Sequence, residues 1–237
     1  QYPYLNLERI IGAVYSPQDR QIDPTALTLA LVSATQRQGG RIYRHTTVTN
    51  IQPVSQGGGY QVMAAETTWE VDWVIIAAGL GSTSLTTALH QPIDIRPVLG
   101  QALQVELTTG LSGSALEPVI TGEDTHIVPI GNNKYWIGAT VEMPDGEMQR
   151  QMVPDPLALK SVWERTISLC PCLKAATIQR TWQGLRPRPQ GQPAPIVERL
   201  AQHPRVLIAT GHYRNGILLA PATAKLICQM MQMGHVA

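Results

Sequence analysis

The sequence predicts a mixed α/β (α+β) fold, in which a doubly wound α/β region is interrupted by a mainly antiparallel β-sheet region. Three observations support this prediction. A helix, several strands and an apolar strand follow one another over residues 23–79, β-rich segments dominate residues 93–181, and a short apolar strand near the carboxyl end runs into another helix. We therefore expect two domains, one discontinuous and one continuous: residues 1–92 with 184–237, and residues 93–183.

The first helix is expected in IDPTALTLALVSATQRQGG, residues 22–40. Asp23 stands at the N-cap and Pro24 at the first helical position, and both residue types favour a helix start at these positions. Gly39 and Gly40 then end the helix. Between them, apolar residues recur at the helical spacing of an amphipathic helix: Leu27, Ala30, Leu31 and Ala34.

Strands are expected after this helix. RIYRH, TVTNIQPV and GYQVMAA have strand patterns, and a turn at 55–59 joins the last two. WEVDWVIIAAG adds a strand whose apolar run, residues 73–78, is typical of a strand buried on both faces of a parallel sheet. The antiparallel region is expected from RPVLGQALQVEL, PVIT, HIVPI and KYWIGATVEM, with a helix over residues 156–169 after Asp155.

Charge and cysteine content exclude several classes of protein. The 18 Lys and Arg residues nearly balance the 17 Asp and Glu residues, so no nucleic-acid or membrane partner is expected. No apolar run approaches the ~20 residues that a spanning helix needs, and we expect a soluble, cytoplasmic protein. The three cysteines, Cys170, Cys172 and Cys228, do not make a disulfide scaffold. Cys170-Pro171-Cys172 lacks a second pair or clustered histidines, so buried or half-buried thiols are expected there and no metal site.

Two apolar strands run into glycine turns, VIIAAGLGSTS at 74–84 and VLIATGHYRNG at 206–216, and we expect both strands in one sheet. Such turns place backbone N–H groups at the carboxyl ends of strands, where open α/β sheets bind ligands. The first turn is close to the dinucleotide fingerprint, but Ser84 takes its third small position and no acid follows about 20 residues later. Two interpretations stay open for it: a nicotinamide site, or a tight turn that closes a core strand.

The second turn places an imidazole, a phenol, a guanidinium and an amide at the start of a helix. Gly211 and Gly216 allow the backbone to approach a ligand closely, and Asn215 can cap the helix. The helix N-terminus offers unpaired N–H donors to an electron-rich group, so the pattern predicts a site for a flat polar ring. The rest of the helix is expected to face the core with residues that share a helical period: Ile217, Ala220, Ala224, Cys228 and Met231.

Three motifs resemble the D-amino-acid-oxidase superfamily, and most closely the flavin-dependent glycine oxidases of thiamine biosynthesis: GHYRNGILLAPATA at 211–224, TWQGLRPRPQGQPAPIV at 181–197 and DWVIIAAGLGS at 72–82. The resemblance implies FAD as cofactor. It identifies the discontinuous domain as part of an FAD-binding domain and the continuous one as a substrate-binding domain. In that family the FAD-binding domain opens with a βαβ unit that carries the glycine fingerprint. This chain lacks that unit, so a further segment is expected upstream of Gln1.

The resemblance also implies a reaction. Glycine or another small amino acid or amine gives its Cα hydride to flavin N5, the imine hydrolyses, and oxygen is reduced to hydrogen peroxide. Arg186 is expected to bind the substrate carboxylate, with Arg214 as a second contact, because a planar guanidinium can donate two hydrogen bonds to one carboxylate. The expected FAD contacts are Val48 beside the adenine, Ala78 and Gly79 near the phosphate and ribose, and Gly211, His212, Tyr213, Asn215, Gly216, Ile217 and Leu218 near the isoalloxazine ring.

Departures and alternatives accompany these expectations. His126 stands where glycine oxidases of this type have a tyrosine that contacts the substrate, so an altered substrate preference is expected. Arg186 could instead brace a proline-rich loop, and Arg214 could pair with a surface carboxylate. A nicotinamide-dependent dehydrogenase that uses GLGSTS and a non-catalytic flavoprotein fragment are the competing functions, and a homo-oligomer is left open.

Overall fold

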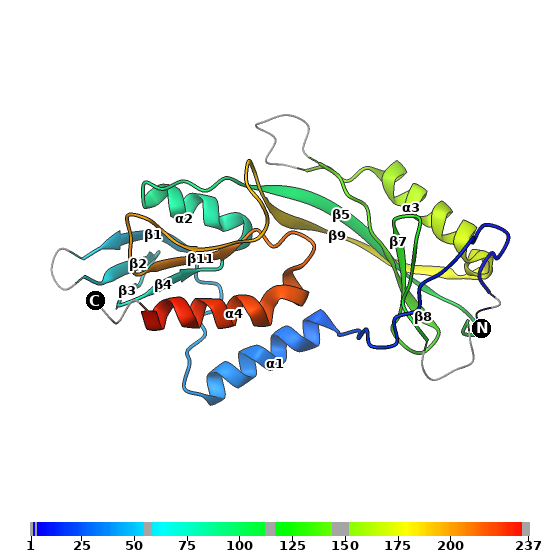
Figure 1. Ribbon diagram of the computed structural model, residues 1–237, viewed down its shortest axis with the longest axis horizontal. Helices are drawn as coiled ribbons and strands as arrows, with labels where there is room; N and C mark the ends of the chain where they lie inside the picture. Colours follow the sequence, from blue (N-terminus) through cyan, green and yellow to red (C-terminus); the bar gives the residue numbers. More distant parts are fainter. Residues whose placement is uncertain (1, 3, 55–57, 112–116, 144–151, 234–237) are drawn as a thin grey trace. The chain divides into compact units, whose positions relative to one another are not determined.

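The chain forms two compact units (Figure 1). Unit 1 comprises Gln1–Gln21 and Val98–Leu185, and unit 2 comprises Ile22–Pro97 and Arg186–Ala237. Residues 1–21, which the sequence analysis grouped with unit 2, therefore belong with the β-rich region. One reason is that the backbone N–H of Asn6 donates to the carbonyl of Leu169 at 2.9 Å. The computed structural model describes residues 2, 4–54, 58–111, 117–143 and 152–233, so the turn expected at 55–59 lies partly outside it.

Unit 2 contains two three-stranded sheets. β1 (Val48–Pro53), β2 (Tyr60–Ala64) and β3 (Thr68–Val71) form an antiparallel sheet in that order. The second sheet has the order β10-β11-β4, with strands at Ile196–Arg199, Val206–Thr210 and Val74–Ile76. β4 and β11 are parallel, which confirms that the two apolar strands share a sheet.

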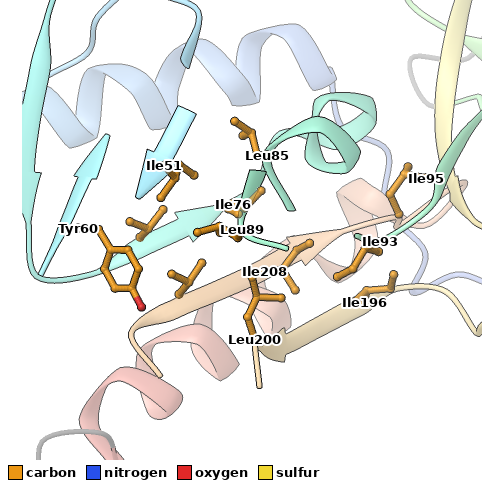
Figure 2. Packing of buried hydrophobic residues seen from close by; sticks show 12 residues of the cluster. Ile51, Tyr60, Ile76, Leu85, Leu89, Ile93, Ile95, Ile196, Leu200 and Ile208 are labelled. Atoms are coloured by element: carbon orange, nitrogen blue, oxygen red, sulfur yellow. The ribbon is translucent and has the colours of Figure 1, made fainter. Parts of the chain in front are cut away.

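The helices of unit 2 are α1 (Pro24–Arg37), α2 (Ser82–Ala88) and α4 (Gly216–Met233), and a 3-10 turn, η1 (Gly79–Gly81), precedes α2. Figure 1 shows α2 and α4 on opposite sides of the sheet that contains β11. The core is formed by side chains from both sheets and from the α2 segment, as Figure 2 shows: Ile51, Tyr60, Val74, Ile76, Leu85, Leu89, Ile93, Ile95, Ile196, Leu200, Val206 and Ile208.

Three expectations for unit 2 are wrong. RIYRH is a loop, whose Tyr43 packs on Trp69 with ring centroids 5.1 Å apart. β4 is not buried on both faces, since it lies at the edge of its sheet and Ile75 is 44% exposed. α1, in contrast, forms as expected, and none of its residues is buried. In α4 the expected core face is not buried, because the helix turns Ile227 inward instead.

Unit 1 is built on a five-stranded sheet of order β6-β7-β8-β5-β9. The pairs β5–β8, β6–β7 and β7–β8 are antiparallel, as the sequence predicted. Helix α3 (Pro156–Leu169) and the 3-10 turn η2 (Pro171–Ala175) close a core with buried residues of this sheet, among them Val105, Ile127 and Ile137. The strand bounds are Ile95–Glu106 for β5, Ile120–Gly122 for β6, Thr125–Pro129 for β7, Lys134–Gly138 for β8 and Thr177–Pro189 for β9.

No helix within the described ranges is long and apolar enough to cross a bilayer.

Candidate functional site

The two glycine turns of unit 2 lie next to each other at the carboxyl ends of β4 and β11. Thr210, the last residue of β11, connects them: its hydroxyl donates to the carbonyl of Gly79 at 3.1 Å and accepts from the hydroxyl of Ser82 at 3.0 Å. Both hydroxyl-bearing residues are buried. The structure thus brings together two motifs that are about 130 residues apart in the chain, at the sheet edge where α/β folds bind ligands.

Gly79 and Gly211 both have left-handed backbones, with φ of +56° and +69°. A Cβ on Gly211 would lie 2.5 Å from Cγ of Pro189, so this position requires glycine for packing as well as for conformation. A Cβ on Gly79 would meet only Cγ of Pro187, at 3.8 Å. The two prolines belong to the end of β9, which therefore packs against both turns.

The end of β9 carries the arginines of the GLRPRP motif. The backbone N–H of Tyr213 donates to the carbonyl of Pro187 at 3.1 Å, and the guanidinium of Arg188 lies 5.8 Å from the centre of the Tyr213 ring. Arg186 is half-buried one residue before Pro187, and Arg214 is exposed in the neighbouring turn. Arg186 and Arg214, the two arginines expected to bind the substrate carboxylate, thus lie on two segments that are hydrogen-bonded to each other.

Sequence reasoning missed Arg188. Residues two apart in a strand point to the same side, so the spacing of Arg186 and Arg188 could have signalled that their side chains share one side of β9. Tyr213, which Arg188 contacts, has a φ of +53°, a conformation that a non-glycine residue seldom adopts. This strained residue stands in the centre of the GHYRNG turn, where backbone strain accompanies many binding sites.

The remaining residues of the second turn divide into inward and outward groups. Nε2 of His212 lies 2.9 Å from the hydroxyl of Thr223 in α4, and burial lowers the pKa of this imidazole, which favours its neutral form. The backbone carbonyl of Asn215 accepts the first hydrogen bond of α4, from the N–H of Leu219 at 2.9 Å, so Asn215 occupies the N-cap position. Ile217 and Leu218 point outward and are 48% and 78% exposed.

Val48, the expected adenine contact, lines an open hollow of about 590 Å³ in unit 2. Aromatic and aliphatic side chains form most of its wall, with Arg41 and Glu70 as charged groups. A hollow of this kind, apolar with a few polar groups, is typical of sites for flat organic ligands. Its lining residues come from the 41–46 loop and from β1 to β4: Arg41, Ile42, Tyr43, Thr46, Val48, Val62, Trp69, Glu70, Val71, Trp73, Val74 and Ile75.

His126 belongs to unit 1, in β7. Its Nδ1 lies 2.9 Å from the hydroxyl of Thr121 in the neighbouring strand β6. Its neighbour Ile127 is buried in the α3 core, and side chains alternate along a strand, so His126 points to the sheet face opposite that core. Within the described ranges, no three His, Cys, Asp or Glu side chains gather as metal ligands would.

Comparison with known proteins identifies relatives over most of the chain. Residues 1–230 match the family described as FAD dependent oxidoreductase, DAO. The glycine oxidase of Bacillus licheniformis is 29% identical over 222 residues, which cover 94% of this chain and 57% of that protein. The bifunctional protein ThiO/ThiG of Synechocystis sp. is 32% identical over 230 residues, covering 94% of this chain and 32% of that protein.

A solved structure agrees with these matches. The crystal structure of glycine oxidase from Geobacillus kaustophilus superimposes with a TM-score of 0.84 at 27% identity, over 98% of this chain and 60% of that chain. The present chain therefore spans a little over half the length of the glycine oxidases that it matches.

Proposed function

Because the chain belongs to the family of FAD-dependent oxidoreductases, we propose that it takes part in the FAD-dependent oxidation of glycine or another small amino acid or amine, with oxygen as electron acceptor and hydrogen peroxide as product. One observation carries this proposal: the arginine-bearing end of β9 packs against two glycine turns that meet through Thr210. The relatives named as glycine oxidases support the choice of substrate class.

The residues of unit 2 fit the cofactor. A Cβ on Gly216 would meet only His212 Cβ, at 3.7 Å, so packing does not explain this glycine, whereas close approach of a ligand to the helix start does. The first N–H groups of α4 have no intrahelical acceptors and can donate to a polar ring edge. Ile217 and Leu218 add exposed apolar surface beside them. When bound there, FAD supplies the hydride acceptor.

We assign the ends of the cofactor accordingly. The GHYRNG turn would hold the isoalloxazine ring, the turn at Ala78 and Gly79 would hold the phosphate and ribose, and the hollow beside Val48 would take the adenine. Unit 2 is then the FAD-binding part, and it also carries Arg186 and Arg214, the proposed carboxylate contacts. The family match does not favour a nicotinamide site at GLGSTS. Within the fold, Ser82 and the Gly79 carbonyl of that turn are hydrogen-bonded to the Thr210 hydroxyl.

The chain's own contribution to the reaction is to bind and orient the substrate. Arg186 binds the carboxylate through two parallel hydrogen bonds, and Arg214 makes a second contact. The backbone beside Arg186 is held in place by the Pro187–Tyr213 hydrogen bond, which limits the positions that the guanidinium can take. Since three relatives of this chain are bifunctional ThiO/ThiG proteins, we propose that the reaction helps to supply the thiazole part of thiamine.

Substitution of Arg186 in the intact, FAD-loaded protein tests this assignment. Arg186→Ala and Arg186→Lys remove the paired hydrogen bonds, which costs about 2 to 4 kcal/mol, a tens-fold to hundreds-fold fall in kcat/KM for glycine. The FAD content, measured from the visible spectrum, stays unchanged. Arg180→Lys is the matched control, because Arg180 lies in the same strand and donates to Gln104.

Two results would count against the proposal. An unchanged kcat/KM in both Arg186 variants, at unchanged FAD content, would reject the carboxylate role of Arg186. No peroxide from glycine, small amino acids or amines in the FAD-loaded wild type would reject the oxidase reaction and favour a non-catalytic flavoprotein.

His126 is proposed to adjust the choice of substrate. His126→Tyr introduces the residue of the glycine oxidases and is expected to change the ratio of kcat/KM for glycine and for larger amino acids by about tenfold. An unchanged ratio across a panel of amino acids and amines would show that His126 does not influence the substrate preference.

A further inference from the structure

Two of the three cysteines lie at the end of α3, in the sequence Cys170-Pro171-Cys172. Their Sγ atoms are 3.4 Å apart. Cys170 is completely buried, whereas Cys172 is exposed and its sulfur lies 3.8 Å from the carbonyl of Tyr4. Unit 1 therefore contains a pair of thiols of which one is open to small solutes and the other is not.

The local backbone explains why the two sulfurs meet. Cys170 follows the last residue of α3 and has a non-helical backbone, with φ of −132° and ψ of 81°, consistent with the restriction that a following proline places on the α region. Pro171 then starts the 3-10 turn η2, so the chain bends between the two cysteines. Hydrogen bonds from the Cys170 N–H to Thr166 and from the Leu173 N–H to the Cys170 carbonyl, 2.8 and 3.1 Å long, hold this bend.

We propose that Cys170 and Cys172 are a site of two-electron oxidation by hydrogen peroxide, and that the product is an intramolecular disulfide. The inference does not rest on the proposed oxidase reaction, because peroxide from any source can react here. It rests on the separation of the two sulfurs, on their unequal exposure and on the bend that holds them together.

The reaction needs two steps. In the first, the Cys172 thiolate attacks one peroxide oxygen: an S–O bond forms, the O–O bond breaks, and the hydroxide that leaves takes up a proton as water. In the second, the sulfur of Cys170 attacks the sulfenic sulfur of Cys172: the S–S bond forms, the S–O bond breaks, and the leaving hydroxide takes the Cys170 proton as a second water. Two thiols and one peroxide thus give one disulfide and two waters.

The surroundings divide the two roles. Cys172 is accessible and receives the peroxide. Burial is the main cause, and the neighbouring Cys172 the second, of a raised pKa of Cys170, so this sulfur keeps its proton until the leaving hydroxide of the second step takes it. Once Cys172 is a sulfenic acid, Cys170 is the nearest thiol, and the sulfurs need to approach only from 3.4 Å to the bonded distance of about 2.05 Å.

A metal is a poorer explanation of the pair. A tetrahedral zinc site takes four protein ligands or three with an open position, and no His, Asp or Glu joins these sulfurs among the described residues.

Cys228 provides an internal standard for the rate of thiol oxidation, since it is an exposed thiol on α4 of unit 2.

The test uses the reduced, purified full chain, treated with hydrogen peroxide, quenched with catalase and alkylated before peptide mass spectrometry. We expect the peptide that contains Cys170 and Cys172 to become lighter by two hydrogens and to lose both sites of alkylation. This loss should be about tenfold faster than the loss of alkylation at Cys228. Cys228→Ser is the matched control and should leave this reaction unchanged.

Single substitutions separate the two roles. In Cys170→Ser, Cys172 should remain a sulfenic acid that dimedone traps, and in Cys172→Ser, Cys170 should stay reduced. Cys170→Ala is a second variant in case a serine hydroxyl disturbs the core, and the urea midpoint checks that each variant is folded. The proposal is overturned if Cys170 stays alkylatable while Cys172 is oxidised further, or if both thiols survive peroxide that oxidises Cys228.

Discussion

Helices α1 and α3 have the same length and the same start signal but opposite environments. Each has 14 residues and begins with a proline that follows an aspartate N-cap, and Asp23 and Asp155 both accept hydrogen bonds from backbone N–H groups of the first turn. α3 buries Val162, Thr166 and Leu169, whereas none of the α1 residues is buried. The difference shows that capping and proline define where a helix begins, while burial depends on what the rest of the chain places against it.

The largest expected difference between the two helices is in a leucine truncation. Leu169 of α3 is 8% exposed and Leu31 of α1 is 57% exposed. Leu169→Ala should lower the free energy of unfolding by about 2 to 5 kcal/mol, because it removes buried surface and leaves a cavity. Leu31→Ala should change it by no more than about 0.5 kcal/mol. Urea unfolding followed by circular dichroism measures both, and similar losses would contradict the comparison.

A smaller difference is expected for two threonines. The Thr166 hydroxyl is buried, donates to the Val162 carbonyl at 2.8 Å and lies 3.1 Å from the Thr125 hydroxyl. Thr166→Val deprives Thr125 of this partner and should cost about 1 to 3 kcal/mol in unfolding free energy. In α1 the exposed Thr35 hydroxyl makes the same bond to the Leu31 carbonyl, so Thr35→Val should be close to neutral.

The double variant Thr125→Val with Thr166→Val checks the cause. Removing both hydroxyls leaves neither without its partner, so the double variant should be more stable than Thr166→Val alone. A double variant that loses the sum of the two single effects would show that the hydroxyl pair is not responsible.

Substitution of the two N-cap residues, Asp23 and Asp155, should affect different measurements. Asp155→Ala should reduce the global free energy of unfolding by about 1 kcal/mol, because α3 is part of a packed core. Asp23→Ala should instead speed amide hydrogen exchange in α1 and leave the global value nearly unchanged, because a helix without buried residues can open by itself. Exchange in α1 that is as slow as in α3 would contradict this expectation.

α4 lies between α1 and α3, because it has one buried residue. The smallest effect is expected at His212, which precedes α4 and contacts Thr223 of this helix. Burial lowers the pKa of His212 below its ordinary value of 6.5, so the unfolded chain binds more protons than the folded chain as the pH falls below this value. The stabilisation is thus complete above about pH 6.5 and is lost as the pH falls through the folded-state pKa. His212→Gln should flatten the fall in stability between about pH 7 and pH 5, and an unchanged slope would reject this.

The sequence by itself identified the features that depend on neighbouring residues and on apolar patterning. The Asp-Pro starts of α1 and α3, the parallel strands that end in glycine turns and the antiparallel region were all predicted correctly. The resemblance of three motifs was enough to name the family and its cofactor. These features were predictable because capping, proline geometry and strand patterning act over a few residues.

Only the tertiary structure decided which surfaces are buried and which distant side chains meet. Gly211 needs to be glycine because Pro189 occupies the space of its Cβ, and Arg188 reaches Tyr213 because β9 ends beside that turn. Ile75, which a fully apolar run suggested was buried, lies on an edge strand and is exposed. The helical period in α4 suggested the wrong face, since Ile227 alone turns inward there. In each case the outcome depends on whether a segment many residues away packs at that position. Local sequence patterns do not contain this information.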